Sequence, residues 1–111
     1  MSTPDLQLLR GTLDVLVMRA LQRGSQHGYA IAGWIHTVTD QTLEIEDGAL
    51  YSALHRMEQR RWLASRWGQS ENNRRAKYYR LTRKGRRQLE LASATWESYA
   101  DAVFKVLRAD D

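Results

Sequence analysis

The spacing of the apolar residues changes twice along this chain, and these changes limit the folds that it can adopt. Over residues 6–21 the apolar side chains recur every three or four positions, which is the period of one face of a helix. Over residues 63–81 the period shortens towards two, as in a β-strand, and from residue 83 onwards it is helical again. The sequence therefore predicts a mainly α protein with a small β-hairpin before a long last helix.

Two further helices and their end signals complete this outline. The sequence predicts helices over residues 29–38 and 48–60, and a turn from Gly24, which ends the first helix. Asp47 is expected to cap the third helix, because a carboxylate can accept the free amide hydrogens of the first turn. Thr82 is expected to cap the last helix in the same way, at the start of residues 83–107.

The third predicted helix has one apolar side and one polar side. At 100° per residue, Leu50, Leu54 and Met57 lie within about 60° of one another and are expected to face the core. The remaining surface carries side chains that can hydrogen-bond to base edges and phosphates, although the same side chains also suit water. The candidate DNA-contacting residues on this surface are Tyr51, Ser52, His55, Arg56 and Gln59.

The predicted hairpin consists of strands over residues 63–67 and 77–81, joined by a polar loop over residues 69–73. Tyr79 and Leu81 share one face of the second strand and are expected to pack inward. Cations are concentrated near the hairpin tip, and no acidic residue follows Glu71 there. The candidate DNA-contacting residues on the hairpin are Arg74, Arg75 and Lys77.

Charge is distributed very unevenly along the chain, although its net value is only +4. Residues 48–87 hold twelve Lys or Arg and two acidic residues, whereas the segments on either side are each acidic by three charges. Such a block predicts a polyanion-binding surface, with a solvated basic face as the alternative. Four cations stand where a helix N-terminus disfavours them, so an anion is expected beside them: Arg83, Lys84, Arg86 and Arg87.

The last helix has a narrow apolar stripe, which we call the seam. Its members are spaced alternately three and four residues apart, as in the a and d positions of a coiled coil. A stripe this narrow suits one partner helix, so we expect the seam to hold two copies of the chain together. The residues of the seam are Leu89, Ala92, Trp96, Tyr99, Val103 and Val106.

Several classes of protein are not expected from this composition. The chain has no cysteine, which excludes disulfides, zinc–thiolate sites and a thiol nucleophile. Its three histidines lack metal-ligand spacing and its glycines form no phosphate-binding loop, so we expect no metal, no cofactor and no enzyme. No apolar run is long enough for a membrane span and the first residues do not resemble a signal peptide, so a cytoplasmic protein is expected.

Three short helices followed by a basic hairpin are typical of a winged helix-turn-helix, whose third helix enters the major groove of DNA. We expect residues 1–82 to form this DNA-binding domain and residues 83–111 to form a dimerisation helix, both within one compact unit. If six of the cations met phosphates, the logarithm of the binding constant would fall with log salt at a slope of about −5.

Four stretches of the sequence resemble the PadR family of bacterial transcriptional regulators. They cover residues 9–13, 27–29, 48–58 and 77–85, in that order and at the spacing of the family. Many members have a basic pair directly before the two tyrosines, whereas here Ala76 precedes Lys77, and Arg74 and Arg75 lie one residue earlier.

Members of this family are dimeric winged-helix proteins, and most of them are repressors. The resemblance therefore implies that this chain binds a pseudo-palindromic operator in double-stranded DNA as a dimer. It implies DNA contacts by two groups of residues: Tyr51, Ser52, His55 and Arg56 on the third helix, and Arg75 and Lys77 on the hairpin. Similar positions to Trp96 in multidrug-sensing members hold a tryptophan that sandwiches planar aromatic compounds, so Trp96 is a candidate effector-binding residue. The alternative for Trp96 is simple packing at a dimer interface.

The sequence leaves open two other functions and the environments of three tryptophans. A protein-interaction adaptor could keep the winged helix without sequence-specific binding, and an RNA-binding module would need an exposed aromatic platform that is not evident. Trp62 and Trp67 flank the first hairpin strand and are expected in the core or packed on the hairpin. Trp34 could face the core or a dimer surface.

Overall fold

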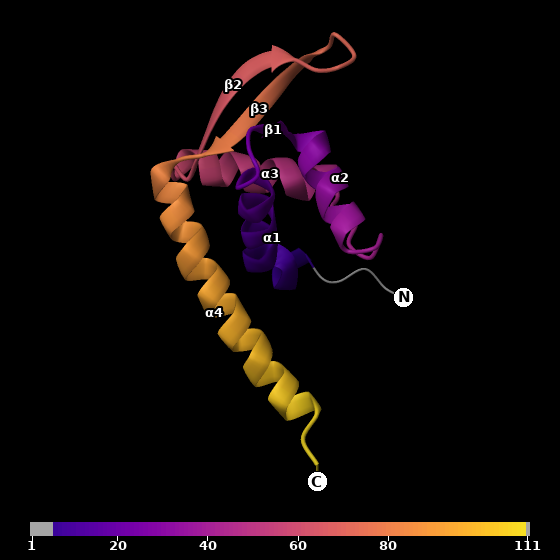
Figure 1. The fold of residues 1–111 in the computed structure, drawn as a ribbon, viewed down its shortest axis with the longest axis vertical. Coiled ribbons are helices and arrows are strands. Elements are labelled where there is room, and N and C mark those ends of the chain that lie inside the picture. The colour runs from indigo at the N-terminus through magenta and orange to yellow at the C-terminus, as the bar shows by residue number, and fades with distance from the viewer. Residues whose placement is uncertain (1–5, 111) are drawn as a thin grey trace.

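The computed structural model describes residues 6–110, with side chains from Gly11 onward. The expected apolar positions Leu6 and Leu9 therefore lie outside the residues whose side chains are described. The described residues form four helices and a small sheet (Figure 1), which confirms the predicted fold class. The elements are α1 (Leu6–Leu21), β1 (Gln26–His27), α2 (Gly28–Val38), α3 (Asp47–Gln59), β2 (Leu63–Gln69), β3 (Arg75–Leu81) and α4 (Arg83–Leu107).

The three strands form one antiparallel sheet in the order β1-β3-β2. Strands β2 and β3 make the hairpin, which we call the wing (residues 63–81). Both strands are longer than predicted, because the pairing continues out to Gln69 and Arg75. The two-residue strand β1 was not predicted, since two residues show no period, and its segment was expected to be only a turn. Pairing of His27 with Tyr78 attaches the start of α2 to the wing.

The core lies where α1, α2 and α3 meet the inner face of the sheet. The predicted apolar side of α3 is confirmed, because its three predicted core residues are almost completely buried. Tyr79 and Leu81 are buried as well, so the predicted inward face of β3 is also confirmed. Full burial of a large apolar side chain contributes about 1.5–3 kcal/mol to folding. The most deeply buried large residues are Val17, Met18, Ile31, Ile35, Leu50, Leu54, Met57 and Leu63.

Of the two predicted N-terminal caps, the one of α4 matches the structure and the one of α3 does not. The Thr82 hydroxyl accepts a hydrogen bond from the Gly85 amide at 3.0 Å, which confirms the predicted cap of α4. The prediction for Asp47 was wrong, because Glu46 occupies the cap position of α3 in an extended conformation and Asp47 is the first helical residue. Asp47 still favours the helix electrostatically, since a negative charge in the first turn complements the helix dipole.

Helix α4 leaves the body of the molecule at the base of the wing and extends well beyond it (Figure 1). Its start is packed so closely that a Cβ on Gly85 would lie 2.0 Å from the Trp62 carbonyl oxygen, so only glycine fits there. Leu89 is the last residue of α4 to be buried. Within residues 6–110, none of the helices combines the length and the hydropathy that crossing a membrane requires.

Candidate nucleic-acid interface

The outer surface of α3 carries most of the predicted DNA-contacting side chains in exposed positions. Tyr51, Ser52, His55 and Gln59 are all exposed to solvent, whereas Leu54 and its apolar neighbours anchor the opposite side of the helix. The ring of Tyr51 leans towards the start of α2, where a Cβ on Gly28 would lie 2.9 Å from the Tyr51 hydroxyl oxygen. The exposed side of α3 therefore offers the Ser52 hydroxyl, the His55 imidazole and the Gln59 amide, none of which makes a side-chain hydrogen bond within residues 11–110.

Arg56 is the predicted α3 contact that does not lie free. Its guanidinium donates to the Asp14 carboxylate of α1 at 2.5 Å, and both side chains are mostly covered. At 100° per residue, Arg56 lies about 120° from Leu50, at the edge of the outer surface, and its ion pair with Asp14 holds it against α1. Arg56 therefore fixes α3 to α1, and we do not count it among the free cations of the surface.

The outer part of the wing carries free cations. Arg74 and Arg75 are exposed, and within residues 11–110 the structure gives neither of them a carboxylate partner. The Arg75 guanidinium lies 4.3 Å from the ring centre of Trp67, a cation–π contact. Trp67 is 56% exposed, so of its two predicted environments the structure shows packing on the wing and not in the core. Trp62, by contrast, packs against the core as predicted.

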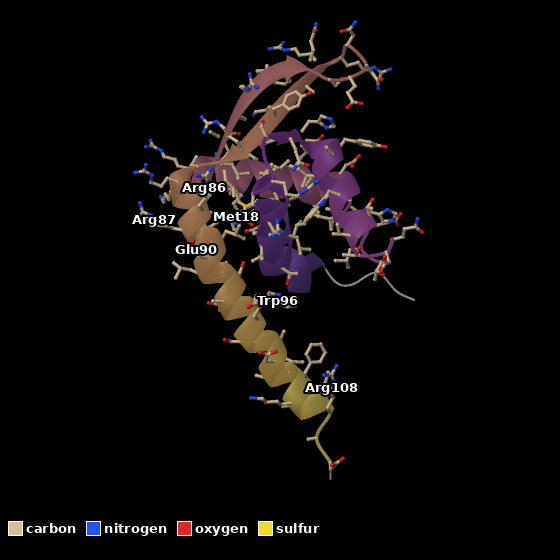
Figure 2. The ribbon with its side chains drawn as sticks, viewed as in Figure 1. Met18, Arg86, Arg87, Glu90, Trp96 and Arg108 are labelled. Carbon is tan, nitrogen blue, oxygen red and sulfur yellow. The ribbon has the colours of Figure 1, made fainter. Side chains whose placement is uncertain are left out.

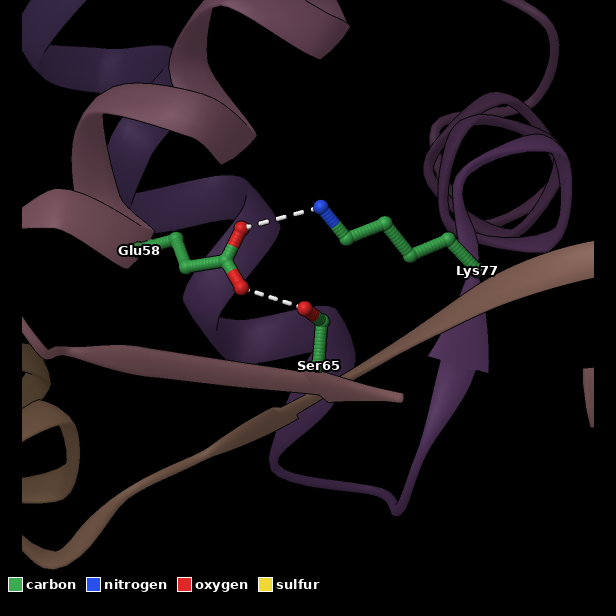
Figure 3. Close-up of polar contacts among 3 residues, drawn as sticks. All are labelled: Glu58, Ser65 and Lys77. Carbon is green, nitrogen blue, oxygen red and sulfur yellow. Dashed lines mark hydrogen bonds and ion pairs between the residues drawn. The ribbon is translucent and has the colours of Figure 1, made fainter. Parts of the chain in front are cut away.

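Lys77 lies in a different environment from the two wing arginines. Its Nζ donates to the Glu58 carboxylate of α3 at 3.3 Å, and the same carboxylate accepts a hydrogen bond from the Ser65 hydroxyl (Figure 3). The Ser65 hydrogen bond, and after it the Lys77 ammonium, hold the pKa of the Glu58 carboxyl below its usual value against the opposing effect of burial. The wing cation that the sequence placed on DNA is therefore already paired inside the protein.

The cations at the start of α4 lie at the base of the wing. Figure 2 shows Arg86 and Arg87 projecting from the first turns of the helix, and all four cations of this segment are exposed. No ion pair to any of these four occurs within residues 11–110. The predicted accumulation of cations at a helix N-terminus is thus left without a counter-charge in the described part of the chain.

Some surface residues near α3 were not singled out by the sequence. Tyr29 at the start of α2 is 83% exposed, and its ring lies 6.5 Å from that of His27. His27 in turn caps α2, because its Nδ1 accepts a hydrogen bond from the Ala30 amide at 3.2 Å. In the sequence, residues 27–29 carry part of the resemblance to the PadR family, but nothing in them indicates that the aromatic residue is exposed.

The seam of α4 divides into a buried start and an exposed remainder. Leu89 is buried in the core of its own chain, and Ala92 is half-buried. Trp96 is 43% exposed, and its Nε1 donates to the Thr12 hydroxyl of α1 at 2.8 Å (Figure 2). Further along, Val103 is half-buried, Tyr99 is 68% exposed and Val106 is 76% exposed.

Trp34 of α2, for which the sequence allowed either the core or a dimer surface, is half-buried against the core. The guanidinium of Arg23 lies 4.9 Å from the centre of its ring.

Several solved structures that resemble this chain are of transcriptional regulators. A PadR family transcriptional regulator from Eggerthella lenta is 36% identical, with a TM-score of 0.75 over 95% of this chain and 89% of its own. A transcriptional regulator from Clostridium thermocellum is 30% identical, with a TM-score of 0.80 over 89% and 96% of the two chains. A PadR family regulator from Clostridium difficile is also 30% identical, with a TM-score of 0.71 over 86% and 97%.

The family comparison agrees with these structural likenesses. The model of the PadR-like family of transcriptional regulators matches residues 17–91, which span the end of α1, all of α2 and α3, the wing and the start of α4. The matched segment therefore contains every residue of the candidate interface on α3 and the wing. This chain belongs to the PadR-like family of transcriptional regulators.

Proposed function

We propose that this chain is a homodimeric repressor that binds a pseudo-palindromic operator in double-stranded DNA. The observation that carries the proposal is the exposed polar surface of α3 beside the free cations Arg74 and Arg75 of the wing. Hydroxyl, imidazole and amide groups of α3 can hydrogen-bond to base edges, while the wing arginines can neutralise phosphates. The unpaired cations at the start of α4 support the same partner, because they extend the basic surface along the base of the wing.

Dimerisation through the seam is part of this proposal. The exposed remainder of the seam consists of Trp96, Tyr99 and Val106, three apolar side chains on one side of a helix that projects from the body. A second copy of α4 would cover these side chains, and two copies of α3 would then face successive major grooves. The half-sites would lie about 10 base pairs apart, or a multiple of that distance.

Selection from a random DNA pool tests this function. Duplexes retained by the purified protein are sequenced, and the same selection is run with the His55→Ala and Ser52→Ala variants. We expect wild type to enrich a palindromic motif and the variants to lose preference at defined base pairs in each half-site. An absence of any enriched motif would contradict sequence-specific binding and favour the adaptor function.

We also propose that a planar aromatic effector releases the repressor by stacking on Trp96. The position of Trp96 within the exposed part of the seam supports this, since two copies would bring two indoles near the dimer axis. Stacking contributes about 0.5–1.5 kcal/mol per aromatic pair beyond the area buried. Since two indoles would stack on one dye, a fluorescence titration with a planar dye should show at least about fivefold weaker binding for Trp96→Ala than for wild type. Equal dye affinities in the two proteins would contradict the role of Trp96.

A further inference from the structure

A carboxylate on α3 joins three elements of the molecule at one point. Glu58 accepts the Ser65 hydroxyl of β2 on one oxygen and pairs with the Lys77 ammonium of β3 on the other (Figure 3). Ser65 stands opposite Tyr79 in the strand register, and Lys77 stands opposite Trp67. Since paired residues and residues two apart share a face, Ser65 and Lys77 lie on the wing face that covers α3. We call Glu58, Ser65 and Lys77 the Glu58 cluster.

Lys77 is held from two directions within this cluster. Besides the Glu58 carboxylate, its Nζ lies 5.6 Å from the ring centre of the buried Tyr79. The side chains of Lys77 and Glu58 are only 35% and 29% exposed, whereas Arg74 and Arg75 further out on the wing are exposed and unpaired within the described residues. Of the three wing cations that the sequence predicts on DNA, Lys77 is therefore paired within the protein, whereas Arg74 and Arg75 remain exposed.

The position of Glu58 on α3 explains what the cluster fixes. At 100° per residue, Glu58 and Arg56 are about 160° apart around the helix, so they lie on opposite flanks. Arg56 ties one flank to α1 through Asp14, and Glu58 ties the other flank to the wing. Between these two flanks lies the exposed surface of α3.

We propose that Glu58, Ser65 and Lys77 are positioning residues that set the angle of the wing against α3, so that Lys77 acts through Glu58 and does not contact phosphate. This inference rests on the DNA-binding function proposed above. It has a consequence with an unusual sign: removing the negative charge of Glu58 weakens binding to a polyanion, although electrostatics alone would strengthen it.

The experiment measures fluorescence anisotropy of a labelled mixed-sequence DNA duplex at several salt concentrations. The variants are Glu58→Gln, which keeps an acceptor for Ser65 but loses the ion pair, Ser65→Ala, which changes no charge, and Lys77→Gln. The matched control is Glu71→Gln, which removes one negative charge from the exposed wing loop outside the cluster. Thermal unfolding of each variant shows that it is folded at the temperature of the titration.

We expect Glu58→Gln and Ser65→Ala each to weaken binding about threefold to tenfold, while Glu71→Gln leaves it unchanged or tighter. The slope of log affinity against log salt should stay at the wild-type value in Lys77→Gln, because no phosphate contact is lost. Combining Glu58→Gln with Lys77→Gln should weaken binding no more than Lys77→Gln alone, since both act through one contact.

Three results would overturn the proposal. One is a Glu58→Gln affinity that rises as in Glu71→Gln, and another is an unchanged affinity in Ser65→Ala. The third is a salt slope whose magnitude is smaller by about 0.9 in Lys77→Gln than in wild type, which is the value for one lost phosphate contact. These failures are distinct from failure of the proposed function, in which the wild-type protein itself would show no salt-dependent binding to the duplex.

Discussion

The winged-helix body and the outer part of α4 differ in how their apolar residues are used. Between Leu13 and Leu89 the body buries most of its large apolar side chains in one core, with Tyr29, Val38, Tyr51 and Trp67 left exposed, whereas no described residue of α4 after Leu89 is buried. In that outer part Leu91, Trp96, Tyr99, Phe104, Val106 and Leu107 are exposed instead. The body thus has a core of its own within one chain, whereas the outer part of α4 exposes apolar side chains that the proposed dimer would cover.

The largest effect should follow from a change in the core of the body. Leu54→Ala removes a fully buried side chain of α3, and we expect the free energy of unfolding to fall by about 2–5 kcal/mol. Chemical denaturation at two protein concentrations measures this loss, which should be the same at both. A loss that vanished at high protein concentration would contradict a body that is complete within one chain.

The next effect should appear only in self-association. Replacing Tyr99 and Val106 by serine removes two exposed seam side chains, and we expect dimer affinity to fall about 100-fold or more, because each buried apolar group contributes about 1.5–3 kcal/mol. Sedimentation equilibrium measures the association constant. Leu91→Ser is the matched control, since Leu91 is 67% exposed on α4 but lies off the seam. A dimer weakened equally by both changes would contradict a dimer contact through the seam.

A smaller effect concerns the Glu58 cluster. Because the pKa of Glu58 is lowered in the folded protein, its ionised form contributes stability above the unfolded pKa of about 4.3, and this contribution is lost as pH falls through the folded value. The free energy of unfolding at pH 7 should be about 0.2–1 kcal/mol higher for wild type than for Glu58→Gln, a small difference because the ion pair is partly solvated. Thermal unfolding should show this difference unchanged down to pH 5 and shrinking below about pH 4. A difference that grew towards acid pH would contradict the pairing.

Much of the fold was predictable from the sequence because the spacing of the apolar residues distinguishes its helices from its strands. The apolar side of α3, the inward residues of β3 and the Thr82 cap of α4 were all predicted, since each follows from local spacing or local chemistry. Strand β1 was not predicted, because its two residues pair only with a strand some fifty residues later in the chain. The cap of α3 was misassigned by one residue, since Glu46 and Asp47 differ in backbone conformation and not in charge.

The candidate interface was predictable in outline and not in detail. Helical angles placed Ser52, His55 and Gln59 on the outer surface, where the structure also has them. They could not show that Arg56 and Lys77 find carboxylates at residues 14 and 58, because these partners lie 42 and 19 residues away along the chain. A count of positive charge therefore overestimates the cations that are free to meet a polyanion.

The salt dependence of duplex DNA binding shows whether the free cations of the wing meet phosphates. For wild type we expect a slope of log affinity against log salt of about −5, and Arg74→Gln with Arg75→Gln should reduce its magnitude by about 1.8. Lys105→Gln with Arg108→Gln, at the far end of α4, removes the same charge and should leave the slope unchanged. A flat wild-type slope, or equal slopes in all three proteins, would contradict the account.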